Sequence, residues 1–488
     1  MLYYYQGGKI VMYDIVIIGA GIIGSSIAYN LGKYQLKTLV LEKEDDVAMH
    51  ASKANSGIIH SGYDCQVNTL KAKLNVKGNQ MYPPLAKELH FPLKMIGSLV
   101  LAFNEEEAKH LQILLTQGKT NGISDLYLLD HDQVLAMEPN IDNSVYQALY
   151  APNAGITCPY QTTLAFAESA AINQVEYRFN FQVSSIKKSE DVFTINNEIK
   201  TRYIINAAGV YSDEIAKMVN DNDYRITPRK GEYLLLDKTA RMFNHVLFQV
   251  PSSMGKGVLI TPTVDDNTLI GPTAIDIEDK EDDSVTEAGI QTIKQKAIKT
   301  SSKIDFRSVI TEFSGIRAVC GDDFIIEESH HVKNLINLIG IASPGLASAP
   351  AIGEYVIEIL ENIGLKLIPK SDYHYGRNAP IRTTEISLDK YDKLIKEKPL
   401  YGKIVCRCEV VSEQEIIDAI TGILPATTLD GVKRRTRAGM GRCQSGFCSI
   451  RTMELLSQYQ HRPMVDINKS TINSKIVLKP SKGDNNNE

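Results

Sequence analysis

The pattern of apolar and polar positions near the N-terminus predicts a strand, a helix and a second strand. Residues 14–18 form an almost uninterrupted apolar run, and residues 37–41 form another, as is typical of buried strands. Between them, Ser25, Ala28 and Leu31 are spaced for the packed face of a helix. This order predicts a parallel β-α-β unit.

The middle of the chain alternates between helical and extended patterns. Asn104 followed by Glu107 has the form of a capping box, and a helix with Leu111, Leu114 and Leu115 on one side is expected after it. Short strands are expected at 177–181, 183–186, 193–195 and 203–206. Between 228 and 273, apolar and polar residues alternate, which predicts a half-exposed antiparallel sheet and is interpreted as a substrate domain.

The last third of the chain returns to a buried-strand pattern and then changes. Residues 335–339 predict a strand, and a helix with Ile352, Val356 and Leu360 at four-residue spacing follows. Residues 369–398 are rich in charge, Pro and Tyr without clear periodicity, which indicates a linker before a compact module at about 403–460. The polar end, 482–488, is expected to be disordered.

Length and charge limit the classes of function. A chain of 488 residues is too long for one ordinary core, and its net charge of −5 gives no global attraction to nucleic acid. No apolar run approaches the roughly 20 residues of a membrane-spanning helix, so a cytoplasmic protein without membrane insertion is expected.

The seven cysteines are unevenly distributed. Cys65, Cys158 and Cys320 are solitary and are interpreted as bystanders. The other four form C-x-C and C-x4-C pairs at Cys406, Cys408, Cys443 and Cys448. Such pairs can hold a [2Fe-2S] cluster or a tetrahedral zinc ion, and the spacing alone does not choose between them.

The turn after the first strand carries a dinucleotide fingerprint. Gly19, Gly21 and Gly24 fit G-x-G-x-x-G, in which the glycines allow a tight turn, close approach of the backbone to pyrophosphate and close helix packing. Glu42 stands at the end of the next strand, where an acidic residue binds the ribose hydroxyls. The motif predicts a bound ADP moiety, of FAD or of NAD.

Four further stretches resemble one family. Residues 52–62, 206–213, 228–233 and 343–353 are similar, in order, to segments of the D-amino-acid-oxidase-like superfamily of flavoproteins, and more narrowly to glycerol-3-phosphate dehydrogenases and oxidases and their L-2-hydroxyglutarate-oxidising relatives. The resemblance implies FAD. The flavin contacts expected from the fingerprint and the resemblance together are Gly19, Gly21, Gly24, Glu42, Lys43, Asn55, Ser56, Gly57, Gly209, Gly345 and Leu346.

The resemblance also implies a substrate site. His60 matches the active-site histidine, whose pKa range suits accepting a hydroxyl proton. Arg317 and Lys256 match contacts to an anionic substrate, and Ser343 would supply a hydroxyl donor. Independently, a helix that begins at Gly345 would stabilise negative charge on reduced flavin.

The C-terminal module resembles the bacterioferritin-associated-ferredoxin-like [2Fe-2S] domain of anaerobic-type glycerol-3-phosphate dehydrogenases, through residues 431–442. The resemblance favours iron-sulfur over zinc. Ser412 and Glu415 predict a capping box between the cysteine pairs. The basic run 433–437, with Arg442, has three interpretations. It compensates the negative charge of the thiolates, it binds an acidic partner, or it is a solvated loop.

The expected fold class is α/β, with a Rossmann-like FAD-binding domain, an interleaved α+β substrate domain built mostly on an antiparallel sheet, and a small [2Fe-2S] domain. The FAD-binding domain is placed at 12–90, 151–215 and 325–365, the substrate domain at 91–150 and 216–324, a linker at 366–400, the [2Fe-2S] domain at 401–460 and a tail at 461–488.

The chain is expected to be an FAD-dependent dehydrogenase that oxidises a small anionic alcohol. The first-choice substrate is sn-glycerol 3-phosphate. Its electrons would pass through the cluster to a second electron-accepting flavoprotein subunit. The alternatives are an L-2-hydroxyglutarate dehydrogenase and an electron-relay subunit without a substrate of its own.

Overall fold

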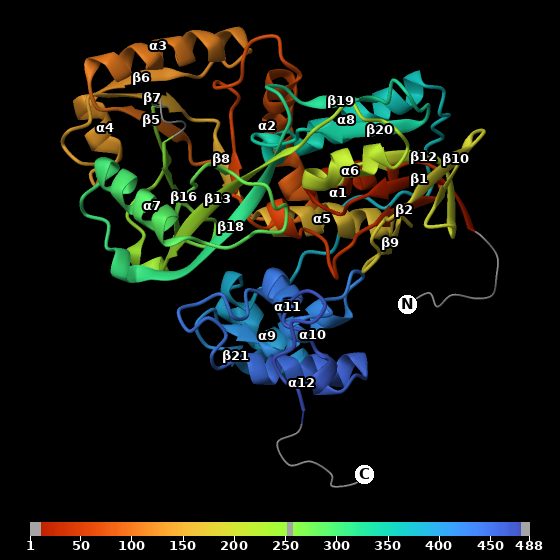
Figure 1. Ribbon diagram of the computed structural model, residues 1–488. Helices are drawn as coiled ribbons and strands as arrows, with labels where there is room; N and C mark the ends of the chain where they lie inside the picture. The colour runs from red at the N-terminus through yellow and green to blue at the C-terminus, as the bar shows by residue number, and fades with distance from the viewer. Residues whose placement is uncertain (1–10, 251–256, 480–488) are drawn as a thin grey trace. The chain divides into compact units, whose positions relative to one another are not determined.

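A computed structural model describes residues 11–250 and 257–479 of the chain. The chain divides into two compact units (Figure 1). The first contains residues up to Lys43 and Val47–Arg377, and the second contains Glu44–Asp46 and the residues from Asn378 onward.

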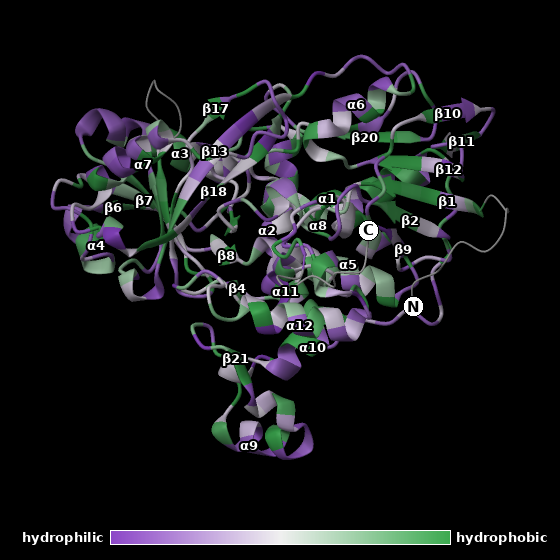
Figure 2. Ribbon diagram, turned by 60° about the horizontal axis from the view of Figure 1, so that its bottom comes forward, coloured by the Kyte–Doolittle hydropathy of each residue, from purple (hydrophilic) through white to green (hydrophobic). Residues whose placement is uncertain are grey.

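The first unit contains an eight-stranded sheet with a parallel centre. In it β1 (Val11–Ile18) pairs in parallel with β2 (Thr38–Leu41) and β12 (Ile199–Asn206). The sheet is completed by β9 (Glu176–Arg178), β10 (Ile186–Ser189), β11 (Val192–Ile195), β19 (Ile325–Glu328) and β20 (Leu335–Ile339). The central strands are strongly apolar (Figure 2) because side chains on both faces are buried, which confirms the predicted α/β class.

Helices pack together beside the parallel strands. These are α1 (Ile22–Leu31), α2 (Leu70–Leu89), α5 (Pro159–Ile172) and α8 (Gly345–Asn362), with the short α6 (Ser212–Lys217) after β12. Gly78 of α2 and Gly353 of α8 allow close helix contacts, because a Cβ on Gly78 would lie 2.2 Å from the Ala347 carbonyl oxygen. The helix expected from Ile352, Val356 and Leu360 is therefore α8, whose inner face is buried.

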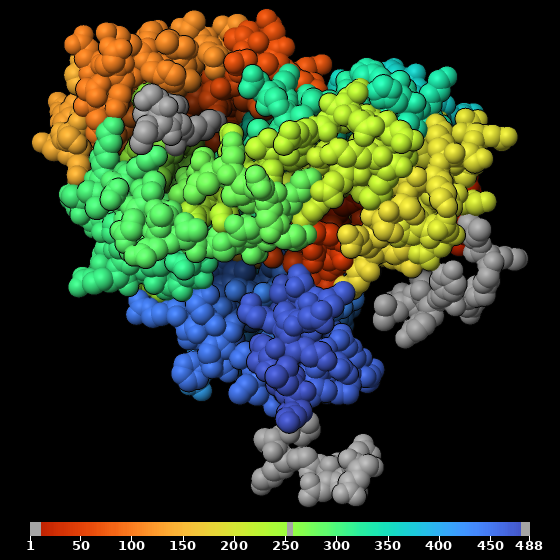
Figure 3. All heavy atoms as spheres, viewed as in Figure 1, coloured from red at the N-terminus to blue at the C-terminus, as the bar shows by residue number. Residues whose placement is uncertain are grey.

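A second, nine-stranded sheet combines two distant parts of the sequence. The early strands are β5 (Ser98–Ala102), β6 (Tyr127–Asp130) and β7 (Gln147–Ala151); the later ones are β13 (Thr227–Leu236), β14 (Val246–Gln249), β15 (Leu259–Pro262), β16 (Thr268–Gly271), β17 (Ile275–Asp276) and β18 (Val309–Val319). Strand pairs are antiparallel except β14 with β5. The orange segment with α3 (Glu105–Thr120) and α4 (His131–Met137) adjoins the green segment with α7 (Glu287–Thr300) in Figure 3.

The prediction that this sheet is half-exposed is wrong. Every residue of β15 and β16 is buried. One face packs against Ile293 and Ala297 of α7, and on the other Leu259 packs against Ile58 and Ile156. The latter belong to a small sheet of β3 (Ile58–Ile59), β8 (Gly155–Thr157) and β4 (Leu93–Lys94).

The second unit has a small core of its own. It contains α9 (Leu388–Glu397), β21 (Ile404–Cys406), β22 (Val411–Ser412), α10 (Glu413–Thr421), α11 (Leu429–Thr436) and α12 (Ser449–Gln460). Ser412 and Glu415 form the predicted capping box at the start of α10. Buried Ile416, Val432 and Leu456 join three of its helices.

Two further sequence predictions differ from the structure. Residues 183–186 are not a strand, since β10 begins at Ile186; Val183 is apolar because it packs in the core beside the sheet. Residues 388–397 of the expected linker form α9, on which Tyr391 donates a hydrogen bond to the Tyr401 carbonyl oxygen. The expected disorder at 482–488 lies outside the described residues. None of the described helices is both long enough and apolar enough to span a bilayer.

Candidate functional site

The glycine-rich turn packs without room for side chains. Gly19 has φ of +106°, and a Cβ on it would lie 2.5 Å from the Ala207 carbonyl oxygen. A Cβ on Gly24 would lie 1.9 Å from the Gly19 carbonyl oxygen, so only glycine lets α1 approach the strand this closely. The turn thus has the shape that the fingerprint requires.

Side chains from two other segments hold this turn. The Glu42 carboxylate accepts a hydrogen bond from the Ala20 N–H at 2.7 Å, and the Ser52 hydroxyl accepts one from the Ile22 N–H at 2.9 Å. In the described part of the chain, the N–H groups of Gly21 and Ile23 donate to no protein acceptor. These donors, at the positive end of α1, fit a pyrophosphate group.

Residues 52–62, here named the second flavin segment, are fixed by their own side chains. Asn55 accepts a hydrogen bond from the Gly57 N–H at 2.8 Å and donates to the carbonyl oxygens of Ala51 and Ser52. Gly57 has φ of +68°, and a Cβ on it would lie 2.5 Å from the Thr157 carbonyl oxygen. Asn55 and Gly57 therefore shape the backbone that leads to His60.

His60 is held through its backbone. Its carbonyl oxygen accepts hydrogen bonds from the side-chain amides of Asn75 at 2.7 Å and Asn79 at 3.2 Å, both on α2. Its half-buried ring lies 5.7 Å, between centroids, from the ring of Phe248 on β14. The imidazole therefore lies between the second flavin segment and the nine-stranded sheet.

The last glycine-rich turn provides a second helix N-terminus. In the described residues, the N–H groups of Leu346 and Ala347 donate to no protein acceptor, while Ser348 already bonds to the Pro344 carbonyl oxygen. Tyr82 of α2 donates to the Leu346 carbonyl oxygen at 2.6 Å and fixes this end of α8. Two free donors here suit the electron-rich edge of a flavin.

Arg317 is a partly buried cation that forms no ion pair with the other described residues. Its guanidinium donates to the Thr273 carbonyl oxygen at 2.8 Å, and burial lowers the pKa of this side chain. Its strand β18 touches the second flavin segment, because a Cβ on Gly315 would lie 2.0 Å from the Ala54 carbonyl oxygen. A partly desolvated guanidinium without an ion pair can bind an anion.

For the other predicted site residues, the described structure gives no contact that indicates a role in binding. Lys43 forms a salt bridge with Glu281 at 2.8 Å and lies over the Tyr211 ring. Gly209 has φ of +57° and open space at its Cβ position, and Ser343 is exposed before α8. Lys256 lies outside the described residues. The roles of these four residues stay predictions.

The four clustered cysteines form two pairs of sulfur atoms. Cys408 and Cys443 lie 3.6 Å apart, and the Cys448 thiol hydrogen-bonds to the sulfur of Cys406. In the described part of the chain, no three of these sulfur atoms lie within 4.8 Å of one another. Two thiolates for each of two irons match this arrangement better than one tetrahedral zinc ion, whose four sulfur ligands would all be neighbours.

Within the buried pair, the contact between the two sulfur atoms favours the thiolate of Cys406 and raises the pKa of Cys448. The hydrogen bond from Cys448, with backbone hydrogen bonds from Gly439 and Glu409, lowers the pKa of Cys406 to about 6. Gly441 must be glycine, since a Cβ there would lie 2.3 Å from the Cys408 Cβ. Cys406 and Cys448 are buried, whereas Cys408 is exposed.

The basic run is neither a solvated loop nor free positive charge. Arg434 and Arg435 are buried on α11 and form ion pairs with Asp46 at 2.7 and 2.6 Å. Arg437, which ends the helix in the left-handed region, pairs with the buried Glu409 at 2.7 Å. Most of this charge therefore stabilises the second unit.

Sequence reasoning missed two polar side chains of the flavin site. Ser52 caps α1, although it is 30 residues from Ile22. Tyr233, stacked on Phe313 with centroids 5.0 Å apart, places its hydroxyl 3.3 Å from Ser56. The only signal for either residue was its place in a stretch that resembles the family, 52–62 for Ser52 and 228–233 for Tyr233.

Comparison with known proteins agrees with both sites. A family model described as FAD dependent oxidoreductase matches residues 14–359, and one described as BFD-like [2Fe-2S] binding domain matches 404–458. A glycerol 3-phosphate dehydrogenase of Caloramator mitchellensis is 46% identical over 478 residues, which cover 97% of this chain and 100% of that protein.

Two more distant relatives cover less of the chain. The FAD-bound, dithionite-reduced L-alpha-glycerophosphate oxidase of Mycoplasma pneumoniae is 32% identical with a TM-score of 0.72, over 75% of this chain and 99% of that one. The mitochondrial L-2-hydroxyglutarate dehydrogenase of Homo sapiens is 33% identical over 284 residues, 54% of this chain and 61% of that protein.

Proposed function

Because the chain belongs to the FAD-dependent oxidoreductase family, we propose that it is a dehydrogenase that oxidises sn-glycerol 3-phosphate to dihydroxyacetone phosphate. Its cofactors are FAD and a [2Fe-2S] cluster. The observation that carries the proposal is the end-to-end similarity to a glycerol 3-phosphate dehydrogenase, which includes the C-terminal module.

Arg317 gives the proposed substrate a place for its phosphate. The guanidinium is partly buried on β18 and has no carboxylate partner among the described residues, so a phosphate would supply the missing countercharge. Gly231 lies opposite Gly315 in the register of β13 and β18. It leaves room for the Arg317 side chain, because a Cβ on Gly231 would lie 3.0 Å from a guanidinium nitrogen of Arg317. This site favours a small anion over an uncharged alcohol.

His60 is the residue proposed to accept the hydroxyl proton of the substrate. During oxidation the hydroxyl oxygen would lose that proton to an imidazole nitrogen, while the hydride leaves the carbon that bears the hydroxyl group. The hydrogen bonds from Asn75 and Asn79 fix the backbone from which the ring projects. When bound, the flavin supplies the hydride acceptor.

The four cysteines are proposed to bind the cluster through which electrons pass from the flavin to the acceptor. An enzyme that returned electrons only to oxygen would need no cluster, and the Mycoplasma oxidase aligns with only 75% of this chain. We therefore expect slow oxygen consumption and rapid reduction of one-electron dyes. The acceptor is proposed to be a second flavoprotein subunit.

The surface beside the cluster cysteines suits such a subunit. Phe447 is 87% exposed next to Cys448, Ile450 is 66% exposed on the first turn of α12, and Val410 is 45% exposed two residues from Cys408. Large apolar side chains at this exposure are typical of a binding surface. An electron-accepting protein that covers them would come close to the exposed Cys408.

Anaerobic mixing of the purified holoprotein with each substrate tests the proposal. Glycerol 3-phosphate should bleach the oxidised flavin rapidly, and L-2-hydroxyglutarate should not. Bleaching by L-2-hydroxyglutarate alone would support the 2-hydroxy-acid dehydrogenase, whose similarity here extends over only 54% of the chain. Bleaching by neither, but by a reduced partner protein, would support the relay subunit. A cytoplasmic location is part of the proposal and is consistent with the seven cysteines, none of which forms a disulfide in the described structure.

A further inference from the structure

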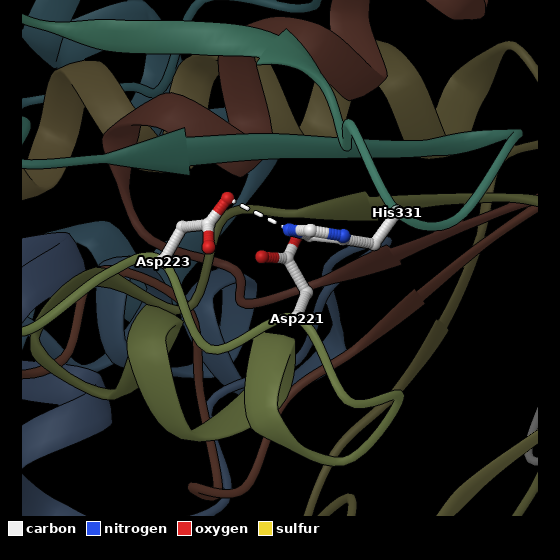
Figure 4. Close-up of side chains that lie close together, drawn as sticks. All are labelled: Asp221, Asp223 and His331. Atoms are coloured by element: carbon white, nitrogen blue, oxygen red, sulfur yellow. Dashed lines mark hydrogen bonds and ion pairs between the residues drawn. The ribbon is translucent and has the colours of Figure 1, made fainter.

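Three metal-ligating side chains meet outside the flavin and cysteine sites. Asp221 and Asp223 follow α6, and His331 lies in the loop between β19 and β20 (Figure 4). One ligand atom of each lies within 4.8 Å of those of the other two. The two loops are more than 100 residues apart in sequence, as the 108-residue separation of Asp223 and His331 shows.

Asp221 brings an unsatisfied buried oxygen to this cluster. The residue is 1% exposed, and its Oδ2 accepts hydrogen bonds from Ser329 at 2.6 Å and from Asn337 at 2.9 Å. Its Oδ1 is buried and has no hydrogen-bond partner among the described residues. A buried carboxylate oxygen without a donor is unfavourable, so this atom requires a cation or an ordered water.

His331 and Asp223 complete the group from the solvent side. His331 Nε2 lies 2.8 Å from Asp223 Oδ2, and each side chain is about half-exposed. The Ser329 hydroxyl accepts hydrogen bonds from the N–H groups of His331 and Val332, so the residue that holds Asp221 also shapes the histidine loop. The group is therefore positioned by the fold.

We propose that Asp221, Asp223 and His331 bind a divalent transition-metal cation of the Zn²⁺ or Mn²⁺ type. One imidazole nitrogen with two carboxylate oxygens suits these ions, whereas Ca²⁺ takes six to eight oxygen ligands. Of the three residues, His331 lines a cavity of about 600 Å³, together with Asn220, Lys188 and Lys333, so water can reach the imidazole. The cation would join the loop after α6 to the β19–β20 hairpin.

Titration of the full-length holoprotein with Mn²⁺ tests this site. Mn²⁺ is the probe because thiolates bind it weakly, so the four cysteines do not compete. Binding is followed by loss of the free-ion paramagnetic signal. The wild type should bind one equivalent, Zn²⁺ should displace it, and an equal concentration of Mg²⁺ should not.

Substitutions distinguish this site from adventitious binding. His331→Ala and Asp223→Asn, both at exposed positions, should weaken Mn²⁺ binding at least tenfold without changing flavin content. His330→Ala is the matched control, since His330 is the neighbouring exposed histidine and pairs with Glu327. Equal Mn²⁺ binding by the wild type and His331→Ala, or no binding by the wild type, would overturn the proposal.

A second measurement does not depend on counting bound ions. A cation that binds only the folded state raises the midpoint of thermal unfolding by mass action. Mn²⁺ should raise this midpoint for the wild type and for His330→Ala, but not for His331→Ala. The same shift in all three proteins would show that the ion acts elsewhere and would also contradict the proposal.

Discussion

The Glu42 carboxylate accepts a hydrogen bond from the Ala20 N–H at 2.7 Å. This bond joins the residue after β2 to the glycine-rich turn after β1. Glu42 is 8% exposed, so this bond forms largely out of water. It therefore positions the carboxylate before any nucleotide binds, at the place where an acidic residue contacts ribose.

Replacing Glu42 by Ala should weaken FAD binding by roughly tenfold or more, since hydrogen bonds to charged groups contribute about 1.5–3 kcal/mol. The measurement is reconstitution of apoprotein with FAD, followed by flavin fluorescence. Glu176→Gln is a suitable control, because Glu176 lies on β9 and bonds only to the Tyr13 hydroxyl in the described structure. Unchanged FAD affinity in Glu42→Ala would contradict a nucleotide role for this residue.

Gly24→Ala should reduce FAD occupancy and stability together. Its Cβ would lie 1.9 Å from the Gly19 carbonyl oxygen, so the turn must move, and overpacking of this kind costs about 1–3 kcal/mol. Gly32→Ala, at the other end of α1, meets no atom closer than 3.3 Å and should be tolerated. Bound flavin and the midpoint of urea unfolding provide the comparison; equal values for both variants would refute the packing argument.

Arg317→Ala should raise the KM for glycerol 3-phosphate by roughly 100-fold, because a charge-assisted contact to an anion in a partly buried site contributes about 2–3 kcal/mol. Steady-state kinetics with a dye acceptor measures this effect. Arg307→Ala removes the same charge from a side chain that is 91% exposed, and should leave KM unchanged. If both variants keep the wild-type KM, the phosphate does not bind at Arg317.

Cys406→Ser should abolish the visible absorbance of the cluster and its paramagnetic signal after reduction, while bound FAD and bleaching by substrate remain. The rate of electron transfer to one-electron acceptors should fall at least tenfold, because the cluster that passes electrons to them is lost. Cys320→Ser, in the first unit, is the control that should keep all of these signals. A cluster that persists in Cys406→Ser would exclude this cysteine as a ligand.

Asp46→Asn should destabilise the second unit at pH 7 by on the order of 2 kcal/mol. Burial opposes ionisation of Asp46, but Arg435 and Arg434 outweigh it and lower the pKa of the carboxyl to about 2. The unfolded pKa is about 3.9, so this stability is present above pH 4 and is lost as the pH falls toward 2.

Hydrogen exchange of the α11 amides measures this difference. The difference in amide protection between the wild type and Asp46→Asn should be large at pH 7 and should become smaller as the pH falls below about 4. Asp430→Asn removes a partly exposed pair with Lys469 from the same helix and should change stability by less than about 1 kcal/mol. Equal protection of α11 in wild type and Asp46→Asn at pH 7 would contradict a stabilising role for this ion pair.

Local features could be predicted because their causes are local. The turn from Gly19 to Gly24 must be tight and free of side chains, and capping at Ser412 depends on a residue three positions away. The strand 335–339 was predicted with its observed bounds because an apolar run of that length is characteristic of a buried strand.

Features that depend on distant partners could not be predicted. The alternation between 228 and 273 did not reveal that α7 and the β3–β8 sheet cover both faces of the second sheet. The buried pairing of Arg434 with Asp46 joins residues separated by 388 positions, and no periodicity records such a partner.

The sequence by itself determined the nucleotide turn, the set of four cysteines and the residue types of the site. The tertiary structure decided that Ser52 caps α1, that the cysteine sulfurs form two pairs, and that Arg317 is partly buried without a carboxylate partner among the described residues. The physical reason is that backbone conformation follows from neighbouring residues, whereas burial, charge pairing and metal geometry arise only when distant segments pack together.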